Sequence, residues 1–323
     1  MSPSDPAPRL VADIGGTNVR FALLPVGSSE PAQEHTLLCA DFEGLHQAAR
    51  HYFEMVDVQG VTHAAFDVAT AITGDFIKLT NSPWAFSVEQ TRRSLGLERL
   101  LVINDFTALA LSLPLLRADE LLQIGGKQSV DGAPLALIGA GTGLGVSGLM
   151  RHAQQWLAIE GEGGHTAFSP MDEREDGVLR VLRDRYGHVS FERVASGPGL
   201  VALYEALCKL DHCVAKALKP EHVTQEGLSN TDPQCAEALA MFCNVFGTAA
   251  ANLVMTLGAR GGVYIGGGII PKLGDYFVQS NFRKRFENKG RFSKYLSEVP
   301  AWIILAENPA LRGLAAALAA DAT

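Results

Sequence analysis

The chain has 323 residues, of which 47% are hydrophobic and 19% charged, so it is long enough to form two domains with substantial cores. Its net charge of −8 and pI of about 5.6 argue against a surface for nucleic acid or an anionic membrane. Small soluble ligands fit this composition better than polyanionic partners.

Near the N-terminus, an apolar run that contains Asp13 leads into a glycine-rich turn, and a second apolar run follows at once. This pattern predicts a strand, a tight turn and a strand. Backbone N–H groups of such a turn can approach a phosphate closely, Thr17 adds a hydroxyl donor, and Asp13 can face a metal ion. An ordinary Gly-Gly hairpin is the alternative. The candidate phosphate-binding residues are Gly15, Gly16, Thr17 and Asn18.

Strands and helices alternate in the next ninety residues, which indicates an α/β fold. Apolar residues at helical spacing predict a helix that runs from Leu45 to Val56. The expected strands are residues 35–40, 62–70, 76–80 and 100–104.

Asp105 directly follows the apolar strand that ends at Asn104. A carboxylate at this place can accept a proton from a hydroxyl group and align its oxygen for attack on a phosphate. It can equally cap the helix that is expected to start near Phe106, which is a very common arrangement. The residues alone leave both roles open.

The strand-turn-strand pattern recurs at residues 135–150, where the turn contains Gly141 and Thr142. Two such hairpins suggest two similar α/β halves that face each other across a cleft and grip a nucleotide's phosphates from both sides. The second turn also fits the dinucleotide pattern G-x-G-x-x-G from Gly143 to Gly148, but a strand is expected after it instead of the required helix. A third cluster, Gly266, Gly267 and Gly268, follows an apolar run where a strand could end against a base or ribose.

Four polar residues spread along the chain could bind a ligand that carries hydroxyl groups. Carboxylates accept hydrogen bonds from two neighbouring hydroxyls, and a neutral imidazole donates from one nitrogen. His165 could instead be a core histidine, Glu162 a solvated loop acid and Glu192 a first-turn helix residue. The other eight histidines show no spacing that would make a zinc site with His165. The four residues are Asn104, Glu162, His165 and Glu192.

Residues 238–259 carry no charge and are numerous enough to span a bilayer. Polar residues recur at every fourth position from Asn244 to Thr256, which favours a long buried amphipathic helix. Asp232-Pro233 is a suitable start for it and Gly258 a suitable end. Five cysteines without a C-x-x-C pair, and an N-terminal segment without an apolar stretch, point to reduced thiols and a cytoplasmic location.

Together these segments resemble the bacterial glucokinases nearly end to end. The motifs that carry the resemblance are Asp13-Ile14-Gly15-Gly16-Thr17-Asn18, Ile72-Thr73-Gly74-Asp75 with Thr80-Asn81, Trp84-Ala85-Phe86-Ser87, Ile103-Asn104-Asp105-Phe106, Gly161-Glu162-Gly163-Gly164-His165, Glu192-Arg193, Ser196-Gly197-Pro198-Gly199-Leu200, Gly261-Gly262 and Gly266-Gly267-Gly268. One departure is Ala71, where similar enzymes usually have proline.

The resemblance implies an actin-like, ribonuclease-H-like ATPase fold and transfer of the γ-phosphoryl group of ATP to the 6-hydroxyl of D-glucose. It makes Asp105 the catalytic base, which also contacts the sugar. The other sugar-binding residues that it implies are Asn104, Glu162, His165 and Glu192. It places Asp13 on Mg²⁺ through water, and a hard cation that bridges phosphate oxygens is expected there. The implied nucleotide-binding residues are Asp13, Gly15, Gly16, Thr17, Asn18, Gly141, Thr142, Gly266, Gly267 and Gly268.

The expected division is a small α/β domain of residues 1–115 and 306–323 and a larger one of residues 116–305, with the active site in the cleft between them. The last helix, from about Pro309, would return to the small domain and bury its apolar stripe. A homodimer is a mild expectation from the resemblance. A kinase for another hexose, a sugar-sensing regulator on the same fold and an actin-like filament ATPase are the alternatives.

Overall fold

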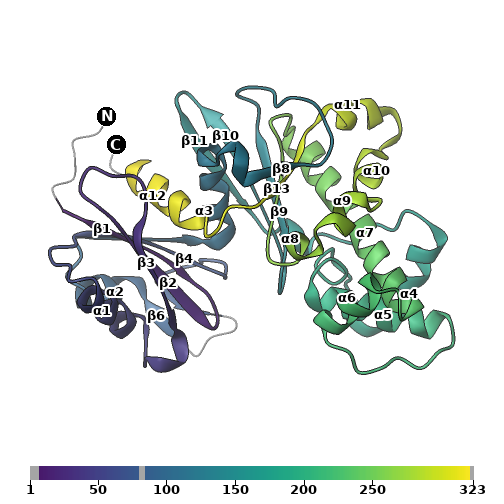
Figure 1. The fold of residues 1–323 in the computed structure, drawn as a ribbon, viewed down its shortest axis with the longest axis horizontal. Coiled ribbons are helices and arrows are strands. Elements are labelled where there is room, and N and C mark those ends of the chain that lie inside the picture. The colour runs from purple at the N-terminus through teal and green to yellow at the C-terminus, as the bar shows by residue number, and fades with distance from the viewer. Residues whose placement is uncertain (1–6, 80–83, 321–323) are drawn as a thin grey trace. The chain divides into compact units, whose positions relative to one another are not determined.

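A computed structural model describes residues 7–79 and 84–320 of the chain, which divides into two compact units (Figure 1). Unit 1 comprises residues 1–117, 152–158 and 306–323, and unit 2 comprises residues 118–151 and 159–305. The sequence analysis placed residues 152–158 in the larger domain, because a division read from sequence keeps neighbouring residues together. The structural division depends on contacts in space, and it places these residues in unit 1. Thr80 and Asn81, which belong to one of the quoted motifs, lie outside the described residues.

Unit 1 is built on a five-stranded sheet with the order β3-β2-β1-β4-β7. The β1–β2 hairpin is antiparallel, and β4 and β7 continue the sheet in parallel. The strands are β1 (Arg9–Ile14), β2 (Asn18–Leu24), β3 (Ala32–Leu38), β4 (His63–Val68) and β7 (Arg99–Asn104), with a separate pair β5 (Phe76–Lys78) and β6 (Ala85–Ser87). The helices are α1 (Leu45–Met55), α2 (Val88–Ser94), α3 (Asp105–Ser112) and α12 (Ala310–Ala320).

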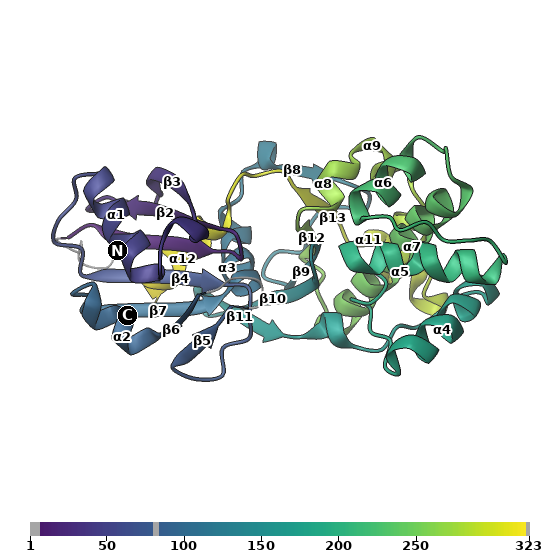
Figure 2. The ribbon, with the colours of Figure 1, turned by 90° about the horizontal axis from the view of Figure 1, so that it is seen from below.

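Helices cover both faces of this sheet, as the view from below shows (Figure 2). One face packs against α1, where Tyr52 is fully buried against Phe21 at a ring distance of 5.2 Å. The other face packs against α3 and α12, with the predicted stripe of α12 in its core. Gly313 of α12 lies so close to the Ala108 carbonyl that a side chain would clash. The stripe residues are Leu311, Leu314, Ala315 and Leu318.

Unit 2 repeats this arrangement in a six-stranded sheet with the order β11-β10-β9-β12-β13-β8. Here too an antiparallel hairpin, β9–β10, is followed by two parallel strands, β12 and β13. The strands are β8 (Leu121–Gln123), β9 (Leu135–Ala140), β10 (Leu144–His152), β11 (Gln155–Gly161), β12 (Gly262–Gly266) and β13 (Ala301–Ile304). The helices are α4 (Glu173–Tyr186), α5 (Gly197–Leu210), α6 (Pro220–Leu228), α7 (Pro233–Leu257), α8 (Ile270–Leu273), α9 (Asp275–Gln279), α10 (Phe282–Glu287) and α11 (Ser293–Glu298).

The long uncharged segment forms α7, as predicted. Asp232 caps it by accepting from the amides of Gln234 and Cys235, and Gly258 ends it in the left-handed conformation. By length and composition α7 could cross a membrane, but 72% of its most apolar window is buried inside the unit. The polar stripe is only partly exposed: Thr248 is buried and its hydroxyl donates to the Asn244 carbonyl at 3.3 Å, whereas Thr256 is exposed. We therefore describe α7 as a core helix of unit 2.

The predicted strand at residues 35–40 is shifted in the structure. β3 spans Ala32–Leu38, and Cys39–Asp41 forms a 3₁₀ turn instead. The amide of Cys39 donates to the carbonyl of Thr17 at 2.8 Å, so pairing with the first hairpin turns the chain at this point.

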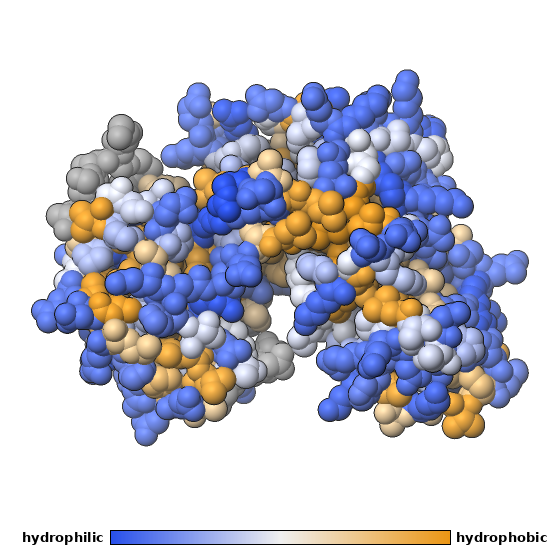
Figure 3. Space-filling view, in the orientation of Figure 1, coloured by the Kyte–Doolittle hydropathy of each residue, from blue (hydrophilic) through white to orange (hydrophobic). Residues whose placement is uncertain are grey.

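The view of Figure 3 shows a mostly hydrophilic surface, with apolar residues gathered over the part of unit 2 that contains β8, β13 and α9.

Candidate active site

The predicted turn after Asp13 is present in unit 1. Ile14 pairs with Val19 across the hairpin, and the amide of Gly15 donates to the carbonyl of Asn18 at 2.9 Å, which closes the turn. Thr17 and Asn18 are exposed at its tip. Gly15 leaves little room for a side chain, since a Cβ would lie 3.1 Å from the Asn18 carbonyl oxygen. The turn therefore presents backbone and hydroxyl groups to solvent, as a phosphate-binding loop must.

Asp13 lies near the end of β1 and forms an ion pair with the residue opposite it on β2. Its carboxylate accepts from the Arg20 guanidinium at 2.8 Å, and the same guanidinium lies 3.3 Å from Glu34. Asp13 keeps about a third of its side chain exposed. One carboxylate oxygen is engaged by Arg20, and the acid thus has a fixed orientation at the mouth of the hairpin.

The structure separates the two roles that the sequence left open at the end of β7. Asn104 caps α3, because its side-chain oxygen accepts from the amides of Phe106 and Thr107 at 2.9 and 3.3 Å. Asp105 is the first residue of the helix, and its carboxylate accepts from the Phe106 amide at 3.0 Å. The N-cap of α3 is therefore Asn104, and the Asp105 carboxylate is held in place by the Phe106 amide and by the Asn104 side chain.

The surroundings of Asp105 raise its pKa to about 6, from 3.8. Burial of the carboxylate is the main cause, and the neighbouring Asp13 charge adds to it, while the hydrogen bond from the Phe106 amide opposes the shift. A carboxyl group with this pKa is ionised at neutral pH and is still a stronger base than an ordinary aspartate. Its protonation properties suit a general base.

A third acid in this region was missed in the sequence analysis. Asp67, on β4, is fully buried, and neither of its carboxylate oxygens has a hydrogen-bond partner among the described residues. It is directly opposite Asp13 in the parallel ladder. Burial and the charges of Asp13 and Asp105 raise its pKa well above the usual range. The detectable signal was an acid inside the otherwise apolar run of residues 64–69.

This donor set fits a hard divalent cation. Magnesium prefers carboxylate oxygens and water, and Asp13 offers a partly exposed carboxylate beside the turn. Asp67 is opposite Asp13 in the parallel ladder, and burial together with the Asp13 charge raises its pKa, so this acid is less suited to a cation than Asp13. Asp13 is therefore the acid of unit 1 that is suited to hold a magnesium ion.

The second predicted turn lies in unit 2 between β9 and β10. The amide of Gly141 donates to the Gly143 carbonyl at 2.8 Å, and the amide of Gly197, at the start of α5, donates to the Gly141 carbonyl at 2.8 Å. Thr142 is exposed. A strand, β10, follows the turn, so the G-x-G-x-x-G pattern here does not open a dinucleotide-binding helix.

The glycine cluster after β12 packs against this second turn. Gly267 has a φ of +81°, and a side chain on it would clash with the backbone of Ala140, the residue before Gly141. Gly266 pairs with Gly139 in the parallel ladder, whereas Gly268 faces open space. Unit 2 thus brings the residues predicted for phosphate and adenosine into one region.

Glu162, His165 and Glu192 also come together in unit 2. The two nitrogens of the His165 ring lie 3.9 Å from Glu162 and 3.9 Å from Glu192. Glu162 and His165 are largely exposed, whereas Glu192 keeps 28% of its side chain exposed. The backbone of Gly164 lies against the carbonyl of Leu144, where no larger residue fits. This close approach fixes the loop that carries the polar side chains.

Glu192 has a second function that its sequence context did not indicate. Its carboxylate accepts from the amide of Leu144 at 3.1 Å, just after the turn of the second hairpin. A side chain at Gly143 would lie 2.6 Å from the same carboxylate, which explains the glycine at that position. Glu192 therefore links the predicted sugar-binding residues to the predicted phosphate turn.

Among the described residues, one group of three possible metal ligands lies close together, namely Glu226, Asp232 and Cys235. The ammonium group of Lys216 lies 2.9 Å from Asp232 and 3.5 Å from Glu226. This internal cation supplies the positive charge that the two acids need. All five cysteines of the chain lie in the described ranges, and each is a free thiol.

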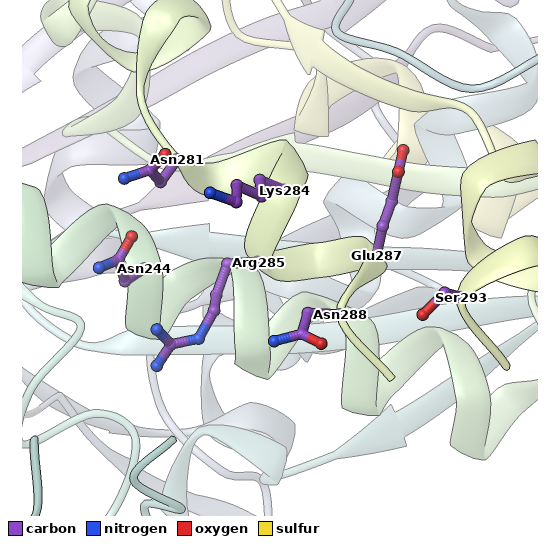
Figure 4. A pocket seen from close by; sticks show the side chains of 7 residues that line it. All are labelled: Asn244, Asn281, Lys284, Arg285, Glu287, Asn288 and Ser293. Carbon is purple, nitrogen blue, oxygen red and sulfur yellow. The ribbon is translucent and has the colours of Figure 1, made fainter. Parts of the chain in front are cut away.

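A pocket of about 480 Å³ in unit 2 contains none of the predicted site residues (Figure 4). It is lined mainly by amide and charged side chains of α7, α10 and the turn that follows. Arg285 in its wall is bound by Glu175 and lies 3.6 Å from Asp172. None of the residues predicted to bind substrate or nucleotide therefore lines this pocket.

The predicted site residues thus form two groups. Unit 1 holds the first turn, Asp13, Asn104 and Asp105, and unit 2 holds the second turn, the glycine cluster and the acid–histidine group. Their use as substrate and nucleotide ligands stays a prediction at this point.

Comparisons with known proteins bear on the whole chain. The family model described as Glucokinase matches residues 10–321. A glucokinase of Chromobacterium violaceum is 52% identical over 315 residues, which cover 97% of this chain and 89% of the relative. The crystal structure of a glucokinase from an Antarctic psychrotroph superposes with a TM-score of 0.89 at 36% identity, covering 98% of this chain and 100% of that one. A glucokinase of the ROK family from Streptomyces griseus, solved in complex with glucose and AMPPNP, has a TM-score of 0.62 at 18% identity, covering 96% and 98%, and thus shares the fold.

Proposed function

The chain belongs to the glucokinase family and is an ATP-dependent hexose kinase with an actin-like fold, and from this we propose how its residues transfer the γ-phosphoryl group of ATP to the 6-hydroxyl of D-glucose. The products are glucose 6-phosphate and ADP, which makes the reaction the first step of glycolysis. One observation carries the proposal: a carboxylate at the end of β7 with its pKa raised to about 6, held by the Phe106 amide.

Asp105 acts as the base. Its carboxylate accepts the proton of the 6-hydroxyl while the hydroxyl oxygen forms a bond to the γ-phosphorus, and the bond from that phosphorus to the bridging oxygen of ADP breaks. The electron pair of the broken bond stays on the bridging oxygen, which leaves as part of the β-phosphate of ADP. Because such transition states need positioning more than covalent help, the hydrogen bond from the Phe106 amide contributes by fixing the carboxylate.

The remaining hydroxyls of glucose are bound by acceptors and donors from both units. Asn104 contributes from the N-cap of α3, where its oxygen is engaged by the helix and its amide nitrogen lies at 3.5 Å from the Thr70 carbonyl. Glu162, His165 and Glu192 contribute from unit 2. Since each unit carries only part of the set, the proposal requires both units to act on the same pair of substrates.

The two glycine turns bind the phosphates of ATP through backbone N–H groups other than those of Gly15 and Gly141, whose amides close the turns. Gly15, Gly16, Thr17 and Asn18 serve in unit 1, Gly141 and Thr142 in unit 2, and Gly266, Gly267 and Gly268 pack beside adenosine. The Streptomyces griseus glucokinase was solved with glucose and AMPPNP bound, which supports this pair of substrates. Asp13 would hold Mg²⁺, as the family resemblance implies, and the ion would neutralise charge on the phosphate oxygens.

The proposed setting is a cytoplasmic homodimer. Five free thiols, four of them buried, support a reducing compartment. The dimer rests on family resemblance, and gel filtration with light scattering tests it directly.

A panel of hexoses tests the function. Purified protein with ATP and Mg²⁺ is assayed for ADP formation with glucose, mannose, fructose and galactose, and the phosphorylated carbon is assigned by ³¹P NMR. Glucose is expected to give the highest kcat/KM and phosphorylation at carbon 6. A higher kcat/KM with another hexose would show that this hexose, and not glucose, is the preferred substrate. Sugar-independent ATP hydrolysis alone would favour a filament ATPase, and sugar binding without turnover a sensor.

A further inference from the structure

The loop that carries His165 is paired with the segment that carries Glu192. Residues 164–168 lie antiparallel to residues 189–192, and three backbone hydrogen bonds of 2.9 Å join them. This pairing sets the register between two segments of unit 2 that are predicted to contact the sugar.

His188 directly precedes the second of these segments, and its imidazole reaches back to the loop. Its Nε2 atom lies 3.0 Å from the His165 carbonyl oxygen. A carbonyl oxygen only accepts hydrogen bonds, so Nε2 carries the proton and donates. The carbonyls of Gly164 and Thr166, on either side of His165, accept instead from backbone amides of the paired segment. The His188 side chain thus binds the carbonyl that lies between these two.

The His165 ring depends on its own backbone for its position. Its two nitrogens lie 3.9 Å from Glu162 and 3.9 Å from Glu192, which is beyond hydrogen-bond distance. The side chain is 59% exposed, so packing does not hold it either. At the backbone, the His165 amide donates to the Glu162 carbonyl at 3.0 Å, and the His165 carbonyl accepts from His188. The bond from His188 therefore helps to fix the backbone from which the imidazole projects.

Support of the fold is the simpler role for His188, and the structure argues against it. His188 is exposed, whereas the paired segments are held by their three backbone bonds. Phe168 and Phe191, one from each segment, are buried and pack edge to face at 6.0 Å. The segments therefore keep their register without the imidazole, which adds a constraint on one peptide group of a predicted sugar-binding residue.

We propose that His188 is a positioning residue for glucose: its Nε2–H holds the His165 carbonyl and so directs the His165 imidazole toward the sugar hydroxyls. This inference rests on the proposed kinase function and deepens it. His188 acts through His165 and contacts neither glucose nor ATP. Its loss should weaken sugar binding and leave nucleotide binding unchanged, because only the His165 loop loses a support.

Two substitutions of similar length separate the donor from the bulk of the side chain. His188→Gln keeps an N–H donor, whereas His188→Met has none. His188→Met should raise the KM for glucose about fivefold, which is the effect of about one lost hydrogen bond. Its kcat and its KM for ATP should stay close to wild type, and His188→Gln should be close to wild type in all three. The control is His152→Met, which replaces an exposed histidine at the end of β10.

A double-mutant cycle tests whether His188 acts through His165. If it does, His188→Met should have almost no further effect on the KM for glucose in the His165→Ala background. Calorimetric titration gives the Kd for glucose of the same proteins, so that binding is measured apart from turnover. Circular dichroism and the Tm show which variants fold.

Three outcomes would overturn the inference: a wild-type KM and Kd for glucose in folded His188→Met, equal losses in His188→Met and His188→Gln, or a full effect of His188→Met in the His165→Ala background. If His188→Met does not fold, His188→Ala takes its place with the same criteria. Wild-type protein that binds glucose without phosphorylating it refutes the proposed function alone, and the Kd values then still decide whether His188 positions His165. Wild-type protein that does not bind glucose refutes both.

Discussion

The two glycine hairpins have the same strand-turn-strand form but different supports. In unit 1 the turn lies beside charged groups: Asp13 is paired with Arg20, and Asp67 is buried next to it. In unit 2 the turn is held by neutral contacts, namely the packing of Gly267 against Ala140 and the Gly197 amide, together with the single carboxylate of Glu192.

This difference indicates a division of labour within a duplicated architecture. Unit 1 concentrates negative charge and is suited to a cation and to proton transfer. Unit 2 brings backbone N–H groups and small residues close together and is suited to the phosphates and the sugar hydroxyls. A change in unit 1 should therefore affect chemistry, and a change in unit 2 should affect binding.

Asp105→Asn gives the sharpest test of this contrast. The substitution keeps the size of the side chain and removes the base, so kcat should fall by at least roughly 10²-fold while glucose binding stays close to normal. Steady-state kinetics measure the first effect and calorimetric titration with glucose the second. Asp57→Asn serves as the matched control on the surface of unit 1. A kcat near that of wild type would show that Asp105 is not the catalytic base.

Glu162→Ala and Glu192→Ala should separate binding from structure in unit 2. Each removes a charged hydrogen-bond partner of the sugar, so the KM for glucose should rise roughly tenfold or more in both. Glu192→Ala should also lower the Tm, because it leaves the Leu144 amide without its acceptor, whereas Glu162 is largely exposed and its loss should not. Equal Tm values for the two variants would contradict the structural link to the hairpin.

Gly141→Val tests the second turn as a phosphate site. A Cβ at Gly141 meets no atom within 4 Å, so the protein itself has room for the new side chain. The valine would keep phosphate away from the backbone, and the KM for ATP should rise about fivefold or more, which corresponds to the loss of about one hydrogen bond. Gly44→Val, at the extended N-cap of α1, is the control. An unchanged KM for ATP in a folded variant would show that the phosphates do not bind at this turn.

The pH dependence gives the smallest effect. The base works in its ionised form, so kcat/KM for glucose should fall on the acid side and reach about half of its plateau near pH 6. The same raised pKa means that the folded state binds a proton more tightly than the unfolded state. The stability from this group is present below about pH 4 and is lost as the pH rises to about 6. If kcat/KM fell to half of its plateau only below pH 5, a group other than Asp105 would be responsible for the decrease.

Local signals predicted much of this molecule. The limits of α7 followed from Asp232-Pro233 and Gly258, because capping and a left-handed terminus are properties of a few adjacent residues. The two hairpins were recognised from their turns for the same reason. The family resemblance supplied the roles of Asp105, Glu162, His165 and Glu192, which isolated residues could not reveal.

The features that escaped prediction depend on strand register and packing. Asp67 is significant only because β4 aligns it with Asp13, and Arg20 only because β2 places it opposite the same acid. The bond between Glu192 and the Leu144 amide joins residues 48 positions apart. The N-cap of α3 lies at Asn104 and not at Asp105, which a one-residue ambiguity in the sequence could not resolve.

The return of the last helix to unit 1 has a consequence for synthesis. Val11, Ala65 and Leu101 on the sheet face that carries Asp13 and Asp67 pack in the same cluster as Leu311 and Leu314 of α12. While the ribosome is still translating, this face is covered by α3 alone, whereas unit 2 already has its last strand by residue 304. We expect nascent chains that stop before residue 310 to protect unit 2 from proteolysis and leave unit 1 cleavable. Unit 1 would then complete its core only when the final helix is made.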